Sequence, residues 1–237
     1  MATEQFTRRN LPQWYVPSAM HFVTFRLAGT IPPHVLVVLV AEKERLLGRK
    51  TVGETKAMHR EMVHKLLFAK YDEYLDRHRD IHWLDDPRVA ALVRRSLYFW
   101  NRKKYGLLAF CIMPNHVHML VRPFDVESVG ELDREGMEPG ETPDSRSPLS
   151  AIMHSLKSYT AHEANKLLGR TGSFWQHESY DHWVRDDDEL ERIVAYINAN
   201  PVKAGLAQRA CDFYWCSAHD RYLHDGDESG WLEQTES

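Results

Sequence analysis

Residues 107–122 read LLAFCIMPNHVHMLVR, two apolar runs separated only by Pro114 and Asn115. Apolar runs of this length joined by two residues predict a tight antiparallel hairpin, although Pro-Asn is not an ideal hairpin turn. His116 and His118 lie two positions apart on the second run, so a strand would direct both imidazoles to the same face of a sheet. The hairpin therefore predicts both the centre of a fold and a pair of histidines on one side of it.

Further strands and helices are predicted on either side of this hairpin. Residues 21–28 (HFVTFRLA) alternate apolar and polar side chains, as a strand does. The predicted strands are 21–28, 107–113, 116–122 and one within 174–185. The predicted helices are two within 35–79, then 86–104, 149–168 and 186–200, the last ended by Pro201.

The order strand, helices, strand, strand, helix, strand matches the ferredoxin-like split βαβ plan. We expect an α+β fold with an antiparallel sheet and helices on one face, plus a helical insertion at about 33–80 and a C-terminal helix. We expect a single domain over residues 1–219, followed by an acidic tail at 220–237. Because this plan serves many unrelated functions, it predicts none by itself.

The net charge of −4 is unevenly distributed along the chain. Residues 124–148 contain eight acids and two bases, and residues 220–237 contain six acids and one base. Removing these two segments from the total leaves +7 on the rest of the chain. The predicted folded body is therefore mildly basic, which permits binding to nucleic acid.

Two neutral imidazoles on one face of a strand can bind one divalent metal ion. A third ligand would have to come from another part of the fold. An isolated H-x-H is about equally compatible with two exposed histidines, so its context decides the interpretation.

That context is the order of three strings, MPNHVH (113–118), GRTGSFWQ (169–176) and NPVKAGL (200–206). In this order they closely resemble the REP-associated tyrosine transposases, single-tyrosine members of the HUH nuclease superfamily. The resemblance covers roughly residues 12–219 and is most specific at 107–122 and 149–206. It implies a transposase-like enzyme that cuts and rejoins single-stranded DNA through a covalent 5′-phosphotyrosine.

The resemblance also implies a nucleophilic tyrosine on a helix after the hairpin, and we expect Tyr159 in LKSYTAHEAN to fill this role together with His116 and His118. A polar metal ligand is implied about one helical turn further on. Glu163, four residues after Tyr159, is our expected third ligand beside His116 and His118, with His162 as its competitor. Tyr180 remains a second candidate for the nucleophile. An oxygen ligand suits Mg²⁺ or Mn²⁺ as the cofactor.

The expected partner is single-stranded or hairpin DNA, contacted by basic residues such as Arg102, Lys157 and Arg170. The alternative function is a domesticated, catalytically silent protein that binds DNA hairpins. No apolar run approaches the roughly 20 residues that cross a bilayer, so we expect a cytoplasmic protein acting on bacterial nucleoid DNA, without a membrane partner. The sequence leaves monomer and homodimer open.

Overall fold

The computed structural model describes residues 5–7, 13–49, 55–124 and 147–220. Its strands are β1 (Gln5–Thr7), β2 (Gln13–Tyr15), β3 (His21–Arg26), β4 (Tyr105–Ile112), β5 (His116–Pro123) and β6 (Tyr180–Trp183). Its α-helices are α1 (Pro33–Leu47), α2 (Lys56–Arg77), α3 (Pro87–Trp100), α4 (Pro148–Leu168) and α5 (Asp187–Lys203). The acidic segments predicted at 124–148 and 220–237 lie almost wholly outside the described residues.

The central element is a four-stranded antiparallel sheet in the order β4-β5-β3-β6. The predicted hairpin β4–β5 is confirmed, and its second strand lies in the middle of the sheet against β3. The α+β fold with an antiparallel sheet is therefore confirmed. A separate two-stranded sheet, β1–β2, was not predicted.

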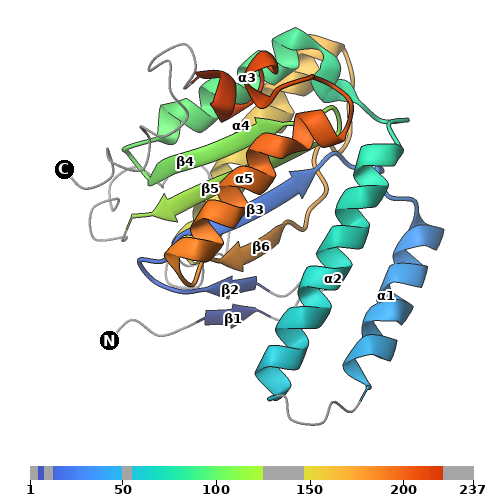
Figure 1. The fold of residues 1–237 in the computed structure, drawn as a ribbon. Coiled ribbons are helices and arrows are strands. Elements are labelled where there is room, and N and C mark those ends of the chain that lie inside the picture. The colour runs from blue at the N-terminus through green and yellow to red at the C-terminus, as the bar shows by residue number, and fades with distance from the viewer. Residues whose placement is uncertain (1–4, 8–12, 50–54, 125–146, 221–237) are drawn as a thin grey trace, which may run out of the picture.

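Helices cover both faces of the sheet (Figure 1). On one face, apolar residues of α3 and α4 pack against Val117 and Met119 of β5. On the other face, α5 packs against Leu120 and against Cys111 of β4. The helices α3 and α4 thus form the single layer expected of a ferredoxin-like core, while the helical insertion and the C-terminal helix α5 form the second layer.

The helix ends follow local signals in the sequence. Asp86 caps α3 by accepting from the backbone N–H of Arg88, and Gly169 ends α4 at φ 61°, a left-handed conformation that suits glycine. The prediction that Pro201 ends the last helix was wrong by one turn. Pro201 is buried inside α5, and the N–H of Ala204 donates to the carbonyl of Asn200, which keeps the final turn closed.

The insertion is an antiparallel pair of helices, α1 and α2, between β3 and α3 (Figure 1). Leu39 of α1 and Leu75 of α2 belong to a small apolar core of their own. Phe68 of α2 packs against Phe22 of the sheet, with ring centroids 5.4 Å apart. The insertion therefore lies over the sheet face that carries His116 and His118.

Candidate metal centre

Alternation along β5 directs Val117 into the core shared with α3 and α4, and directs His116 and His118 to the opposite face. Both histidines are fully buried. Their Nε2 atoms are 3.0 Å apart. The prediction that the two imidazoles point to the same face of the sheet is confirmed.

The third member of the cluster is Asp72, which comes from α2 in the helical insertion. Its Oδ1 lies 3.2 Å from Nε2 of His118 and 3.7 Å from Nε2 of His116. Ligand atoms held about 2.0–2.2 Å from one ion are separated from each other by about 3.0–3.5 Å. Asp72 Oδ1 is also buried without a hydrogen bond to any described residue. Two of the three separations lie within this range and the third is slightly longer, so the cluster could hold one divalent cation.

Hydrogen bonds on the far side of each ring orient the two imidazoles. Asn115 donates through Nδ2 to the carbonyls of Leu75 and His78, so its Oδ1 accepts from Nδ1 of His116 at 2.6 Å. This leaves the lone pair of His116 Nε2 free to face the cluster. Nδ1 of His118 lies 2.7 Å from Oγ1 of Thr24. If Thr24 accepts a hydrogen bond from this nitrogen, Nε2 of His118 also keeps its lone pair for the cluster.

Burial and the interactions within the cluster set its charges. Burial, with a further contribution from His118, lowers the pKa of His116 to about 3, so this imidazole is neutral near pH 7. Burial opposes ionisation of Asp72, but the interactions with His118, His116 and Tyr196 outweigh it and hold the pKa of the carboxyl well below its usual range. A neutral imidazole, as at His116, and a carboxylate, as at Asp72, are the forms of these side chains that bind a metal ion.

Tyr196 of α5 completes the site. Its hydroxyl donates a hydrogen bond to Oδ2 of Asp72, and its ring lies 5.5 Å from that of His118. Burial, and then the charge of Asp72, raise the pKa of this phenol. Nζ of Lys203 lies 3.3 Å from the same Asp72 oxygen. A phenol, a carboxylate and a lysine therefore meet beside the two histidines.

The structure does not bring Tyr159 or Glu163 to this cluster. Both belong to α4, which packs on the opposite face of the sheet. Tyr159 is 56% exposed, and Glu163 forms an ion pair with Lys166 at 2.8 Å. His162, the competing ligand, is exposed and lies 3.7 Å from Glu163. The carboxylate that lies beside the two histidines is therefore Asp72, whereas the sequence analysis expected Glu163 there.

The other candidate tyrosine, Tyr180, lies on the same face as the histidines because β6 pairs it with Thr24. Its ring stacks on Phe68, with centroids 4.2 Å apart.

Two residues predicted to contact DNA, Lys157 and Arg170, make contacts within the protein in this structure. Lys157 donates to the carbonyls of Gln176 and His177, and the guanidinium of Arg170 stacks on a tryptophan ring.

Sequence reasoning missed Asp72 and Tyr196, although each had a signal. Tyr196 lies in the string AYINANPVKAGL, which contains one of the motifs that carry the family resemblance. Asp72 and Asp76 are acids one turn apart on a predicted amphipathic helix. Nothing in the spacing along the chain relates either residue to the hairpin.

The role of the histidine pair in metal binding can be tested by changing Thr24, the residue that contacts Nδ1 of His118. Replacing Thr24 by valine should weaken Mn²⁺ binding by about 10–100-fold, because the ring of His118 loses the partner that orients it. Isothermal titration with Mn²⁺ measures this change. Thr160→Val is the matched control, since this buried threonine lies on α4 and accepts from Trp175; equal losses in both variants would contradict the role of Thr24.

The fold and this cluster define an α+β protein with a candidate divalent-metal site beside a tyrosine. The sequence is similar to a Haemophilus influenzae protein named "Putative REP-associated tyrosine transposase", with 26% identity over 133 residues. The matched region covers 53% of this chain and 66% of that protein, slightly less than two thirds of its length. The resemblance inferred from the motifs is thereby confirmed.

A solved structure of a REP-associated tyrosine transposase bound to a REP hairpin also aligns with the chain. Its TM-score is 0.45 and its identity 15%, over 90% of this chain and 84% of that one. No protein-family profile matches the sequence. Among the described residues, no helix has the length and apolar character needed to cross a membrane.

Proposed function

We propose that this protein is a metal-dependent enzyme that cuts and transfers single-stranded DNA at hairpin-forming repeats, using a tyrosine as the nucleophile. The observation that carries the proposal is the convergence of Asp72, His116, His118 and the Tyr196 hydroxyl. The similarity to a protein named as a tyrosine transposase supports the same reaction class.

In this proposal Asp72, His116 and His118 hold a divalent ion, Mg²⁺ or Mn²⁺. A bound ion would polarise the phosphate of the DNA strand and stabilise the charge that develops on its oxygens. Asn200 is a further candidate ligand, because it lies one turn after Tyr196 on α5 and its Oδ1 is buried without a hydrogen bond to any described residue. It follows Tyr196 by four residues, which is the offset at which the family resemblance implies a polar ligand.

Tyr196, rather than Tyr159, is the nucleophile in this proposal. Its oxygen attacks the phosphorus, forms a bond to the 5′ phosphate, and breaks the bond to the 3′ oxygen, which leaves as a hydroxyl after gaining a proton. Oδ2 of Asp72 accepts the hydrogen bond of this phenol and so orients the attacking oxygen, while the phenol proton is released to solvent. The phosphodiester energy is kept in the phosphotyrosine, so the reverse step can join strands without ATP.

The experiment is to incubate the purified protein with labelled single-stranded hairpin DNA and Mn²⁺, and to look for a covalent adduct on a denaturing gel. We expect an adduct with Mn²⁺ and none with EDTA or with His116→Ala. The substrates would be palindromic repeats from the genome that encodes the protein. An adduct that forms equally well in EDTA would contradict a metal-dependent mechanism.

One observation supports the alternative function, in which the protein binds DNA hairpins but does not cut them. His116 and His118 are fully buried beneath α2 and α5, and the Tyr196 phenol is held in its neutral form. DNA binding without any adduct across a broad set of hairpins would favour this second function.

A further inference from the structure

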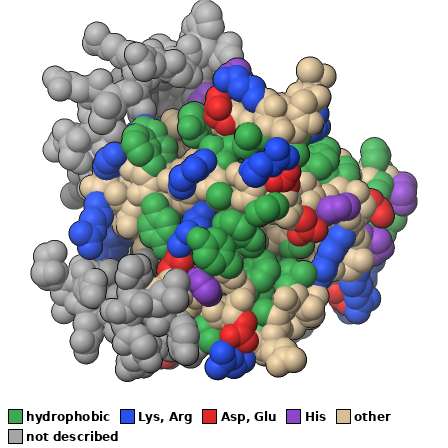
Figure 2. All heavy atoms as spheres, turned by 90° about the horizontal axis from the view of Figure 1, so that it is seen from above, with side chains coloured by type: hydrophobic (Ala, Val, Ile, Leu, Met, Phe, Trp, Pro, Cys, Tyr) green, Lys and Arg blue, Asp and Glu red, His purple; other side chains and the backbone are tan. Residues whose placement is uncertain are grey.

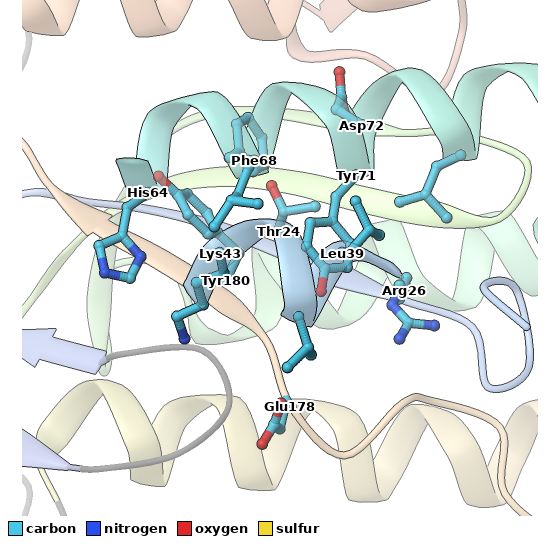
Figure 3. A pocket seen from close by; sticks show the side chains of 13 residues that line it. Thr24, Arg26, Leu39, Lys43, His64, Phe68, Tyr71, Asp72, Glu178 and Tyr180 are labelled. Atoms are coloured by element: carbon cyan, nitrogen blue, oxygen red, sulfur yellow. The ribbon is translucent and has the colours of Figure 1, made fainter. Parts of the chain in front are cut away.

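A pocket adjoins the metal centre. It lies between α1, α2 and the sheet edge formed by β3 and β6, and has a volume of about 50 Å³ (Figure 3). Thr24 and Asp72, which both contact His118, also line this pocket. A group bound in the pocket would therefore lie next to whatever binds at the histidines.

Arg26 is the unusual residue in this pocket. It is the cross-strand partner of His116 in the β3–β5 register, so their Cβ atoms are about 4.5–5.5 Å apart on the same face. The side chain is partly buried, and burial lowers the pKa of its guanidinium. Among the described residues its one hydrogen bond goes to Oγ1 of Thr30 at 3.1 Å, and no carboxylate lies within ion-pair distance.

Two carboxylates, Asp72 and Glu178, line the pocket with Arg26, but among the described residues neither forms an ion pair with it. In Figure 3 the Asp72 side chain points away from the other labelled side chains, toward the histidine cluster. Glu178 interacts electrostatically with Lys43 as well as with Arg26. A partly buried cation without a paired anion is costly, so this position favours binding of an anion from outside.

The pocket has room for a small anion. Its volume of about 50 Å³ corresponds to roughly three to four water molecules at about 15 Å³ each. A phosphate group, with its oxygens around one phosphorus, is compact enough to enter a pocket of this kind. The stacked rings of Phe68 and Tyr180 line the same pocket, with their centroids 4.2 Å apart.

We propose that Arg26 binds a backbone phosphate of the DNA strand next to the phosphate that reacts at the metal centre. The planar guanidinium binds two phosphate oxygens at once, which positions the strand as well as attracting it. This inference rests on the proposed function, since it assumes that DNA is the ligand of the metal centre.

The test measures binding of a labelled single-stranded oligonucleotide to the full chain by fluorescence anisotropy in EDTA at several salt concentrations. Each phosphate contact to single-stranded DNA contributes about −0.7 to the slope of log K against log salt. Arg26→Gln should lower affinity about tenfold and make this slope shallower by about 0.7. Arg26→Lys should keep the slope and lose part of the affinity, because it keeps the charge without the two-pronged contact.

Arg209→Gln is the matched control, because this exposed arginine pairs with Asp212 beyond α5. It should leave both affinity and slope unchanged. An unchanged slope in Arg26→Gln, or a wild-type chain that binds no single strand, would overturn the inference. A changed slope together with no covalent adduct in Mn²⁺ would support the phosphate site while contradicting the nuclease, so the two proposals fail separately.

Discussion

Replacing Tyr196 by phenylalanine should abolish the covalent DNA adduct, with a loss of at least about 10³-fold. The reason is that the proposed nucleophilic oxygen, which donates a hydrogen bond to Asp72 of the cluster, is removed. The measurement is the denaturing-gel adduct assay with Mn²⁺ and hairpin DNA. Phenylalanine keeps the ring that packs near His118, so the fold should be preserved.

Two tyrosine variants serve as matched controls for this prediction. Tyr159→Phe should form the adduct at close to the wild-type level, because Tyr159 lies exposed on the far side of the sheet. Tyr180→Phe should also retain it, because the ring keeps its stacking on Phe68. Loss of the adduct in Tyr159→Phe alone would restore the nucleophile expected from the sequence and contradict the assignment to Tyr196.

The second large effect concerns metal binding and stability. A ligand that binds only the folded state at about 100 times its Kd stabilises that state by about 2.7 kcal/mol. For a chain of this size, Mn²⁺ at that concentration should raise Tm by roughly 5–10 °C. His118→Ala should lose nearly all of this shift, because it removes one of the three ligand atoms and leaves Asp72 with a single imidazole nearby.

The thermal shift is read as the difference in Tm with and without Mn²⁺, so any loss of stability from the substitution itself cancels. His21→Ala is the control, since His21 is another fully buried histidine of the same sheet, and its ring contacts the carbonyl of Val16. It should keep the full shift. A shift that survives in His118→Ala would place the metal elsewhere in the protein.

Basic and aromatic side chains lie together at the end of α3. The face in Figure 2 mixes Lys and Arg side chains with hydrophobic ones and with Asp, Glu and His side chains. Phe99 is 57% exposed, and Nζ of Lys103 lies 3.7 Å from the centre of its ring. Bases stack on exposed aromatic rings, and phosphates bind cations, so Phe99 near the end of α3 and Lys103 just after this helix offer both kinds of contact to the proposed DNA strand.

The sequence by itself determined the elements of the fold and the half of the site that is local. Alternation around PN placed His116 and His118 on one face of a hairpin, and caps such as Asp86 and Gly169 marked the helix ends. These features follow from backbone geometry over a few residues, so they can be inferred without knowing the rest of the chain.

Only the tertiary structure decided which other residues join the histidines. Asp72 and Tyr196 are 44 and 80 residues from His116 along the chain, and they meet it because α2 and α5 pack over the same sheet face. Tyr159 and Glu163 satisfy the helical spacing equally well, but α4 packs on the other face. Spacing along a helix determines which residues share a side of that helix, whereas the side of the sheet it covers depends on long-range packing.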